Sequence, residues 1–134
     1  MEDCIFCKIV KGELPSYKVY EDEDTLAFLD IYPTTHGHTL VIPKEHFKDM
    51  EEIPEEILQR LILTVKKIGK SLKESLAIEA YNICENNGQV AGQVVPHIHF
   101  HLIPRYKDDN LKPWPQTNYP EGKAEEILNK IKIN

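Results

Sequence analysis

Three histidines occupy alternate positions in one apolar segment, VVPHIHFHLIP, which spans residues 94–104. They are His97, His99 and His101. Successive side chains of a β-strand point to opposite faces, so we expect the three imidazoles to share one face while the apolar residues between them pack on the other. Pro96 and Pro104 should mark the strand ends, because proline supplies no backbone donor to a sheet. Half of the six histidines would therefore gather on one face of one strand.

Two kinds of chemistry suit such a cluster. Three converging imidazoles can hold a catalytic metal ion, or one can act as a nucleophile that the others support. Simple exposure on an edge strand does not explain their alternation with strongly apolar neighbours. The preceding loop, residues 88–93, favours the nucleophile, because its two glycines let backbone N–H groups approach an anion closely. An imidazole that attacks phosphorus needs such a cradle for the developing charge, and a second histidine to protonate the leaving group.

The composition is ordinary for a globular protein, with 134 residues, 41% hydrophobic and 28% charged. This length predicts one domain, residues 1–134. The net charge of −6 argues against an extended nucleic-acid surface, so we expect no nucleic-acid partner. No apolar stretch reaches membrane-spanning length and no signal peptide is recognisable, so we expect no membrane association. Three cysteines fit a reducing compartment better than a disulfide framework, which predicts a cytoplasmic protein.

The rest of the chain supplies the elements that position the histidine strand. Apolar runs bounded by turn residues predict a short helix or packed turn at 4–10 and strands at 18–22, 25–31, 38–43 and 80–84. A long helix should begin near Pro54, and its apolar residues recur at helical spacing from Leu58 to Leu72. We interpret this helix as the cover of one side of a sheet. A polar, proline-rich tail at 107–122 leads to a last helix at about 123–133.

The histidine segment, His-Ile-His-Phe-His-Leu-Ile at 97–103, resembles the His-φ-His-φ-His-φ-φ signature of the histidine triad (HIT) superfamily. Three other blocks resemble the same family: DIYPTTHGHTLVIPKEH at 30–46, AGQ at 91–93 and IPR at 103–105. The similarity runs from Cys4 to about Arg105, over three quarters of the chain. It is greatest to the Hint-like branch, and within it to microbial members with an N-terminal CxxC. The core of the domain would then be residues 4–105, with a tail and helix at 106–134.

The resemblance implies the α+β HIT fold, with about five mainly antiparallel strands, one long helix and shorter helices. It also implies a homodimer that binds a purine nucleotide and cleaves nucleoside phosphoramidates of the AMP–amine type. The reaction would pass through a covalent nucleotidyl-histidine and would need no catalytic metal. Two alternatives stay open: a dinucleoside polyphosphate hydrolase of the Ap4A type, and a nucleotide-binding scaffold with vestigial activity.

The same resemblance implies a role for each histidine of the site. His99 matches the nucleophile, and His101 matches the residue that contacts the phosphate and helps to protonate the leaving group. The backbone carbonyl of His97 is expected to fix the tautomer of His99. His38 matches a histidine that buttresses the triad.

Substrate contacts are implied in the same way. Asp30 matches the carboxylate that binds the ribose hydroxyls, although an aspartate can also simply cap a strand end. The residues expected at the base are Ile31 and Phe6, and those expected at the phosphate are Asn86, Gly92, Gln93 and Val94. Relatives often carry Ser or Thr where this chain has Val94, so one side-chain phosphate contact is expected to be missing. We interpret Arg105 as solvated and Trp114 as a packing residue, although in the Hint-like branch the tail reaches the partner subunit's site.

The remaining cysteine motif predicts a structural zinc ion. Cys4 and Cys7 have the CxxC spacing that lets two thiolates chelate one ion, although two small buried hydrophobic residues would have the same spacing. If the strand at 38–43 runs antiparallel to the histidine strand, His46 comes to lie near His97. The chain resembles CxxC-bearing relatives that use such a Cys₂His₂ set for zinc. We therefore expect one zinc per chain on Cys4, Cys7, His46 and His97. Four protein ligands would close the site and leave no position for metal catalysis.

Overall fold

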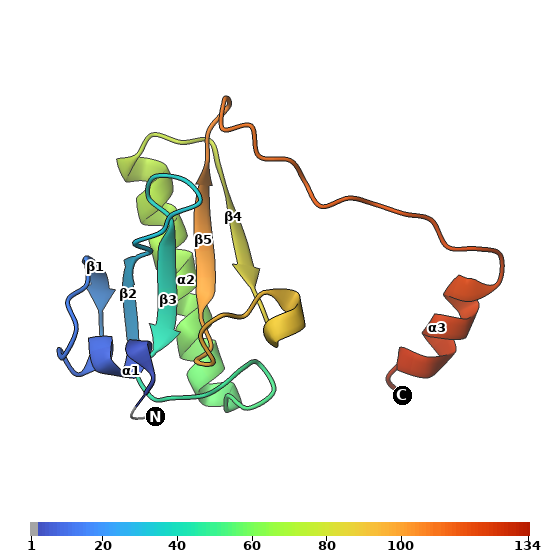
Figure 1. Cartoon of the computed structure of the whole chain (residues 1–134), viewed down its shortest axis with the longest axis horizontal. Coiled ribbons are helices and arrows are strands. Elements are labelled where there is room, and N and C mark those ends of the chain that lie inside the picture. The colour runs from blue at the N-terminus through green and yellow to red at the C-terminus, as the bar shows by residue number, and fades with distance from the viewer. Residues whose placement is uncertain (1–2) are drawn as a thin grey trace.

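The computed structural model describes residues 3–134 and contains one antiparallel five-stranded sheet with the spatial order β1-β2-β3-β5-β4 (Figure 1). The strands are β1 (Lys18–Glu21), β2 (Thr25–Leu29), β3 (Thr39–Pro43), β4 (Ala80–Glu85) and β5 (Phe100–Arg105). The helices are α1 (Ile5–Val10), α2 (Glu55–Ser75) and α3 (Lys123–Ile131), and a 3-10 turn, η1 (Gln89–Ala91), lies between β4 and β5. The fold is therefore α+β, as the sequence predicts.

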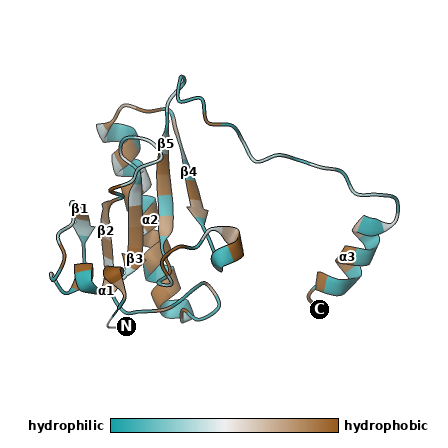
Figure 2. Ribbon diagram, in the orientation of Figure 1, coloured by the Kyte–Doolittle hydropathy of each residue, from teal (hydrophilic) through white to brown (hydrophobic). Residues whose placement is uncertain are grey.

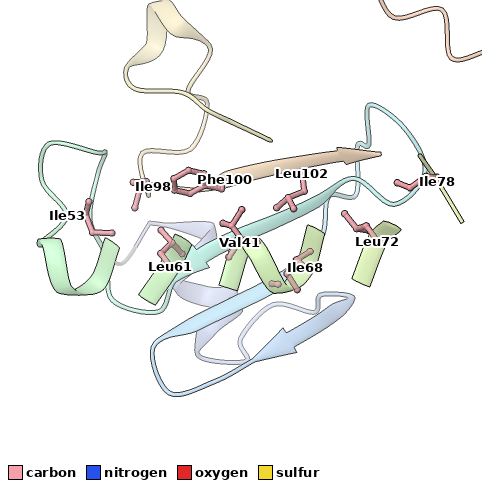
Figure 3. Packing of buried hydrophobic residues seen from close by; sticks show 11 residues of the cluster. Val41, Ile53, Leu61, Ile68, Leu72, Ile78, Ile98, Phe100 and Leu102 are labelled. Atoms are coloured by element: carbon pink, nitrogen blue, oxygen red, sulfur yellow. The ribbon is translucent and has the colours of Figure 1, made fainter. Parts of the chain in front are cut away.

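The long helix α2 covers one face of the sheet because it presents a continuous apolar stripe to it. Pro54 precedes its first turn, and Glu55 and Glu56 lie at the positive end of its dipole. Its inward residues pack against strand residues in one buried cluster (Figure 3). The cluster includes Leu61, Val65, Ile68 and Leu72 from α2, with Ala27, Val41, Ile98, Phe100 and Leu102 from the sheet side.

The opposite face of the sheet is covered over only part of its width, by the short helix α1. Leu26 and Phe28 of β2 and Leu40 and Ile42 of β3 pack there with Phe6 in a second buried cluster. Both faces of β2 and β3 are thus covered, which explains why these strands are apolar at nearly every position rather than at alternate ones (Figure 2). The histidine face of β5 lies beside this second cluster.

The regular ladder of β5 begins later than the sequence predicts. Strand pairing starts at Phe100, so His97 and His99 lie in the extended segment before it, where the Ile98 N–H donates to the Phe47 carbonyl at 2.7 Å. The alternation of faces survives, because Ile98 and Phe100 both pack on the α2 side.

Pro104 lies inside β5 rather than at its end, where the sequence analysis places it. It pairs with Tyr81 of β4, but β3 begins opposite Leu102 and does not reach it. The Pro104 carbonyl accepts a hydrogen bond from Thr35 Oγ1 at 2.7 Å on the side where β3 is missing. The absent N–H of the proline faces that same side, so no ladder bond is lost.

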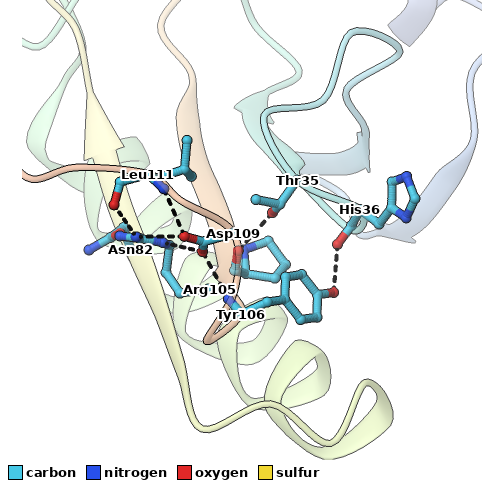
Figure 4. A network of polar contacts seen from close by, with 8 residues as sticks. Thr35, His36, Asn82, Arg105, Tyr106, Asp109 and Leu111 are labelled. Atoms are coloured by element: carbon cyan, nitrogen blue, oxygen red, sulfur yellow. Dashed lines mark hydrogen bonds and ion pairs between the residues drawn. The ribbon is translucent and has the colours of Figure 1, made fainter.

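The tail leaves the sheet through a defined turn that Arg105 fixes (Figure 4). Its guanidinium donates to both carboxylate oxygens of Asp109, to Asn82 Oδ1 and to the Leu111 carbonyl. Arg105 is therefore a clamp rather than the solvated residue that the sequence suggests. Beyond this turn the chain is extended, and α3 stands clear of the sheet in Figure 1.

Trp114 in this extended stretch is 83% exposed, so it has no packing role within the chain. The expectation from sequence that it packs is wrong for the chain taken alone. Within residues 3–134, none of the helices combines the length and the hydropathy needed to cross a membrane.

Candidate active site and metal centre

A cavity of about 400 Å³ opens on the histidine side of the sheet, between α1, the end of β2 and the loop before β5. It brings together seven of the residues expected at the site: Phe6, Asp30, Ile31, Gly92, Val94, His99 and His101. Apolar side chains that the sequence analysis did not single out complete its walls, among them Ile5, Ile9, Phe28 and Leu40. The i, i+4 spacing of Ile5 and Ile9 was the available signal for the α1 wall.

One backbone hydrogen bond fixes the tautomer of His99. Its Nδ1 lies 2.8 Å from the His97 carbonyl oxygen, which can only accept, so Nδ1 carries the proton and Nε2 keeps its lone pair. The Phe6 ring meets the imidazole edge-on with its centroid 5.1 Å away. Burial lowers the pKa of His99, opposed by this hydrogen bond and by Asp30. His99 therefore presents a neutral, oriented nitrogen with a free lone pair beside the cavity.

A second chain of hydrogen bonds fixes His101. The Thr34 N–H donates to His38 Nδ1 at 3.0 Å, so the His38 proton sits on Nε2 and is donated to His101 Nδ1 at 2.9 Å. The proton of His101 is then on Nε2. Burial and then the neighbouring His99 and His38 lower the pKa of His101 to about 4, while Asp30 opposes them. His101 therefore offers an N–H donor next to the lone pair of His99.

Asp30 connects the cavity with these histidines. Its Oδ1 accepts the Tyr32 N–H at 2.8 Å, which holds the turn after β2, and its Oδ2 lies 3.7 Å from His38 Nε2. The carboxylate also lines the cavity with Ile31, where it can accept hydrogen bonds from a sugar. Asp30 thus has a structural role at the strand end and also faces the cavity.

The loop before His97 is shaped by glycines and braced by Gln93. Gly88 and Gly92 have φ values of +94° and +97°, which a residue with a Cβ rarely adopts. The Gln93 side chain donates to the Lys48 and Val95 carbonyls and accepts from the Gly88 N–H. Its amide is therefore used entirely within the protein.

The remaining phosphate-loop residues differ in their access to the cavity. The Asn86 amide lies beside Gly92, because a Cβ placed on Gly92 would stand 3.6 Å from Asn86 Nδ2. Asn86 does not line the cavity. Val94 is 88% exposed at the cavity rim. The Ala91, Gly92 and Gln93 N–H groups donate within the loop, so of residues 91–94 in the described chain it is the Val94 N–H that is free to meet an anion.

The cysteine motif forms a cluster of its own, separate from His99 and His101. The ligand atoms of Cys4, Cys7, His46 and His97 all lie within 4.8 Å of one another. His97 Nδ1 lies 3.4 Å from Cys4 Sγ and 3.6 Å from Cys7 Sγ, and His46 Nδ1 lies 3.3 Å from Cys7 Sγ. Sulfur and nitrogen ligands of tetrahedral zinc stand about 3.5 Å apart, so the four residues fit a zinc ion.

The hydrogen bonds of His97 also suit a metal ligand. Its Nε2 lies 2.9 Å from the Pro43 carbonyl oxygen, so Nε2 is the protonated nitrogen and Nδ1 faces the two sulfurs with a free lone pair. Burial raises the pKa of the Cys7 thiol, and an ion that binds the thiolate would offset that cost.

Asp30, His38 and His101 form the other group of metal-type side chains within reach of one another in the described part of the chain. There the tautomers do not suit a metal. The Thr34 N–H occupies His38 Nδ1, which leaves the proton on Nε2, the atom that would have to bind the ion. The two clusters therefore differ in function: one can hold an ion, and the other is a hydrogen-bonded relay.

An antiparallel sheet with an alternating histidine cluster beside a nucleotide-sized cavity defines a histidine triad protein. The HIT domain model matches residues 11–108, and the chain belongs to the HIT family, in its Hint-like branch. It is 56% identical over 106 residues to an uncharacterised HIT-like protein of Methanocaldococcus jannaschii, covering 79% of this chain and 81% of that one. It is 47% identical to the adenosine 5′-monophosphoramidase of Schizosaccharomyces pombe, covering 96% and 98%.

Solved structures agree with the fold. A HIT family protein from Bacillus subtilis superposes with a TM-score of 0.88 at 41% identity, covering 96% of this chain and 94% of that one. A zinc-bound histidine triad protein from Mycobacterium smegmatis superposes with a TM-score of 0.79 at 42% identity, covering 83% and 81%. The HIT fold predicted from sequence is thus confirmed.

Proposed function

We propose that this protein hydrolyses nucleoside phosphoramidates of the AMP–amine type through a covalent nucleotidyl intermediate on His99. The observation that carries the proposal is the pair of fixed tautomers, which sets a lone pair on His99 Nε2 beside an N–H on His101. Relatives at 42% to 48% identity that are named adenosine 5′-monophosphoramidases support this substrate class.

The nucleotide would bind with its base in the apolar part of the cavity. Phe6 and Ile31 supply walls for a purine, and Asp30 accepts hydrogen bonds from the ribose hydroxyls. The α-phosphate would then meet the free backbone N–H of Val94, beside Gly92 and in front of His99.

The reaction would proceed in two displacements at phosphorus. In the first, His99 Nε2 forms a bond to the α-phosphorus while the P–N bond breaks, and His101 gives the leaving amine its proton. In the second, water attacks the same phosphorus, His101 accepts a proton from it, and the bond to His99 breaks to release the nucleotide. The His97 carbonyl stabilises the positive charge on His99 while the covalent bond exists.

We also propose that Cys4, Cys7, His46 and His97 hold a structural zinc ion. Such an ion would tie α1 to the loop after β3 and to His97, and it would supply no chemistry to the reaction. His97 would then act through its backbone, holding His99 from a fixed position.

Homodimer formation remains part of the proposal. β4 is an edge strand with an open row of backbone groups, and the extended tail carries Trp114, Tyr119 and Leu128 to the surface, all more than half exposed. A second copy would cover the edge and give the tail a surface to bind. We place the protein in the cytoplasm on the ground that Cys4, Cys7 and Cys84 are unpaired thiols.

Comparison of two substrates tests the proposal against its main rival. The expected result is that an AMP–alkylamine conjugate is cleaved with a kcat/KM at least about tenfold above that of diadenosine tetraphosphate, and the reverse preference would indicate a dinucleoside polyphosphate hydrolase. His99→Ala should abolish turnover but keep nucleotide binding, because the ribose and phosphate contacts remain. Activity of this variant within about tenfold of wild type would refute His99 as the nucleophile.

A further inference from the structure

The hydrogen-bonded pair of His38 and His101 has a limit as a proton donor. In the arrangement described above, both rings are neutral, and the single proton of His101 is on Nε2. If a neutral imidazole gave that proton to a leaving amine, it would become an imidazolate anion, which is far too basic to form. His101 can therefore act as the acid only from a state in which it also carries a proton on Nδ1.

That second proton has no place in the present hydrogen bond. His101 Nδ1 accepts from His38 Nε2, and His38 cannot reverse the bond because its Nδ1 already accepts the Thr34 N–H. Two N–H groups would then point at each other across 2.9 Å. A nearby acceptor is needed if His101 is to become positively charged.

Asp30 Oδ2 is in the position of that acceptor. It lies 3.7 Å from His38 Nε2, and a carboxylate oxygen of Asp30 lies within 4.8 Å of a ring nitrogen of His101. Asp30 Oδ1 is held by the Tyr32 N–H, which leaves Oδ2 free to face the two rings. His38 is 4% exposed and the Asp30 side chain 21%, so their interaction is only weakly screened by water.

The other groups around His101 cannot take this role. His99 lies beside it with a ring-centroid distance of 4.8 Å, and its own Nδ1 proton is committed to the His97 carbonyl. Cys84 of β4 stands opposite His101 in the sheet, and burial raises the pKa of its thiol, which keeps it neutral. Asp30 is thus the negative charge that faces the relay from the end of β2.

We propose that Asp30 is a positioning residue for acid catalysis as well as a ribose ligand: its Oδ2 accepts the N–H groups of His38 and His101 when the pair gains a proton. The protonated pair then gives the His101 Nε2 proton to the leaving amine as the P–N bond breaks. This leaves His101 neutral, with its remaining proton on Nδ1 directed at Asp30 and a lone pair on Nε2 that can accept the proton of the attacking water. This inference rests on the phosphoramidase function proposed above. The negative charge of Asp30 acts to raise the pKa of both His38 and His101, which supports the inference.

A substrate without ribose hydroxyls separates the two roles. Asp30→Asn keeps an oxygen for the Tyr32 N–H but removes the charge, and it is assayed on the alkylamine conjugate of 2′,3′-dideoxy-AMP. We expect kcat/KM, which reports the first displacement alone, to fall about tenfold or more although there is no hydroxyl to bind. On the 4-nitrophenyl ester of the same nucleotide, whose leaving group departs without a proton, we expect kcat/KM within about twofold of wild type. Asp24→Asn makes the same charge change at a surface pair with Arg60 and should match wild type on both substrates.

The outcomes are distinct. An unchanged kcat/KM on the dideoxy alkylamine conjugate, or an equal loss of kcat/KM on both leaving groups, would overturn the inference while leaving the phosphoramidase proposal intact. Failure of the wild-type protein to cleave any phosphoramidate would overturn the proposed function itself. A turnover-independent measurement is the ¹⁵N NMR titration of the His101 ring: its apparent pKa should fall in Asp30→Asn, and an unchanged titration would contradict the role of Asp30.

Discussion

Individual histidines of the site owe their different roles to the atoms that their ring nitrogens meet. His97 donates to a carbonyl through Nε2 and turns Nδ1 to the cysteines, whereas His99 donates to a carbonyl through Nδ1 and keeps Nε2 for the substrate. His101 receives a proton from His38 instead. Three identical side chains, two residues apart, are thus given the hydrogen-bonding patterns that the proposed metal ligand, nucleophile and proton donor each require.

Val94 offers a test of the phosphate loop at a single position. Its side chain is exposed at the cavity rim, so Val94→Ser should cost little stability while adding a hydroxyl beside the expected phosphate position. We predict that KM for an AMP–amine conjugate falls about two- to tenfold, the usual net effect of one added hydrogen bond. Steady-state kinetics measures it, with Val94→Ala as the matched control that adds no hydroxyl. A KM for the serine variant equal to that of the alanine variant would place the phosphate elsewhere.

Residue roles divide into those visible in the sequence and those set by distant contacts. The place of His99 was predictable from the alternation of the histidine strand, and those of Asp30 and Phe6 from the family resemblance, and the structure gathers all three around one cavity. The structural role of Gln93 was not predictable, because its side-chain amide donates a hydrogen bond to the carbonyl of Lys48, which is 45 residues away in the sequence. The Arg105 clamp likewise depends on a turn whose geometry no periodicity encodes.

At the scale of elements, α1 links the cysteine cluster to the nucleophile. Cys4 and Cys7 flank Phe6, whose ring packs edge-on against His97 and His99 at 5.8 Å and 5.1 Å. The cysteines and Phe6 therefore belong to the same short helix and its N-cap. A contact that holds the ends of α1 in place also holds Phe6 against His99, the proposed nucleophile.

The double variant Cys4→Ser/Cys7→Ser tests the element that holds α1. We expect the purified wild type to contain about one zinc per chain and the variant to contain none, with an unfolding midpoint lower by about 5 °C or more. Hydrolysis should survive, since His99 and His101 are untouched. Metal analysis and thermal unfolding measure these effects, and Cys84→Ser, outside the cluster, serves as the control. Wild-type protein purified without chelators and free of zinc would refute the site.

Boundaries of the elements were harder to predict than their existence. All five strands and the long helix were expected, but β2 ends at Leu29 and β3 begins at Thr39, which leaves Asp30 and His38 in the segments that flank the strands. Hydrophobic alternation does not mark such ends. Asp30 and His38 continue the extended chain beyond the strands, but they are held by hydrogen bonds rather than by apolar contacts. These ends are where the site residues lie.

At the scale of the whole molecule, the tail is the part that the chain alone does not explain. Helix α3 has no buried residue, and Ile131 and Leu128 are exposed on it. Arg105 and Asp109 nevertheless give the tail a fixed direction of departure (Figure 4). An ordered exit followed by an uncovered amphipathic helix is what a segment that binds a second subunit requires.

We therefore predict a homodimer that depends on the tail and on the edge of β4. Light scattering at micromolar concentration should give twice the chain mass of 15.5 kDa, and removal of residues 107–134 should weaken the association about tenfold or more. An exposed change on the far edge of the sheet, Val19→Thr in β1, is the matched control and should leave the dimer intact. A wild-type mass of one chain would contradict the assembly.

The most direct test of the central claim is to capture the covalent intermediate. Rapid acid-free quenching of the protein with an AMP–amine conjugate, followed by intact mass spectrometry and peptide mapping, should show one adenylyl group on the peptide that contains His99 and none in His99→Ala. The predicted result is an adduct that forms and decays at rates consistent with kcat. Turnover with no adduct at any quench time, or an adduct on His97 or His101 instead, would contradict the assignment of His99 as the nucleophile.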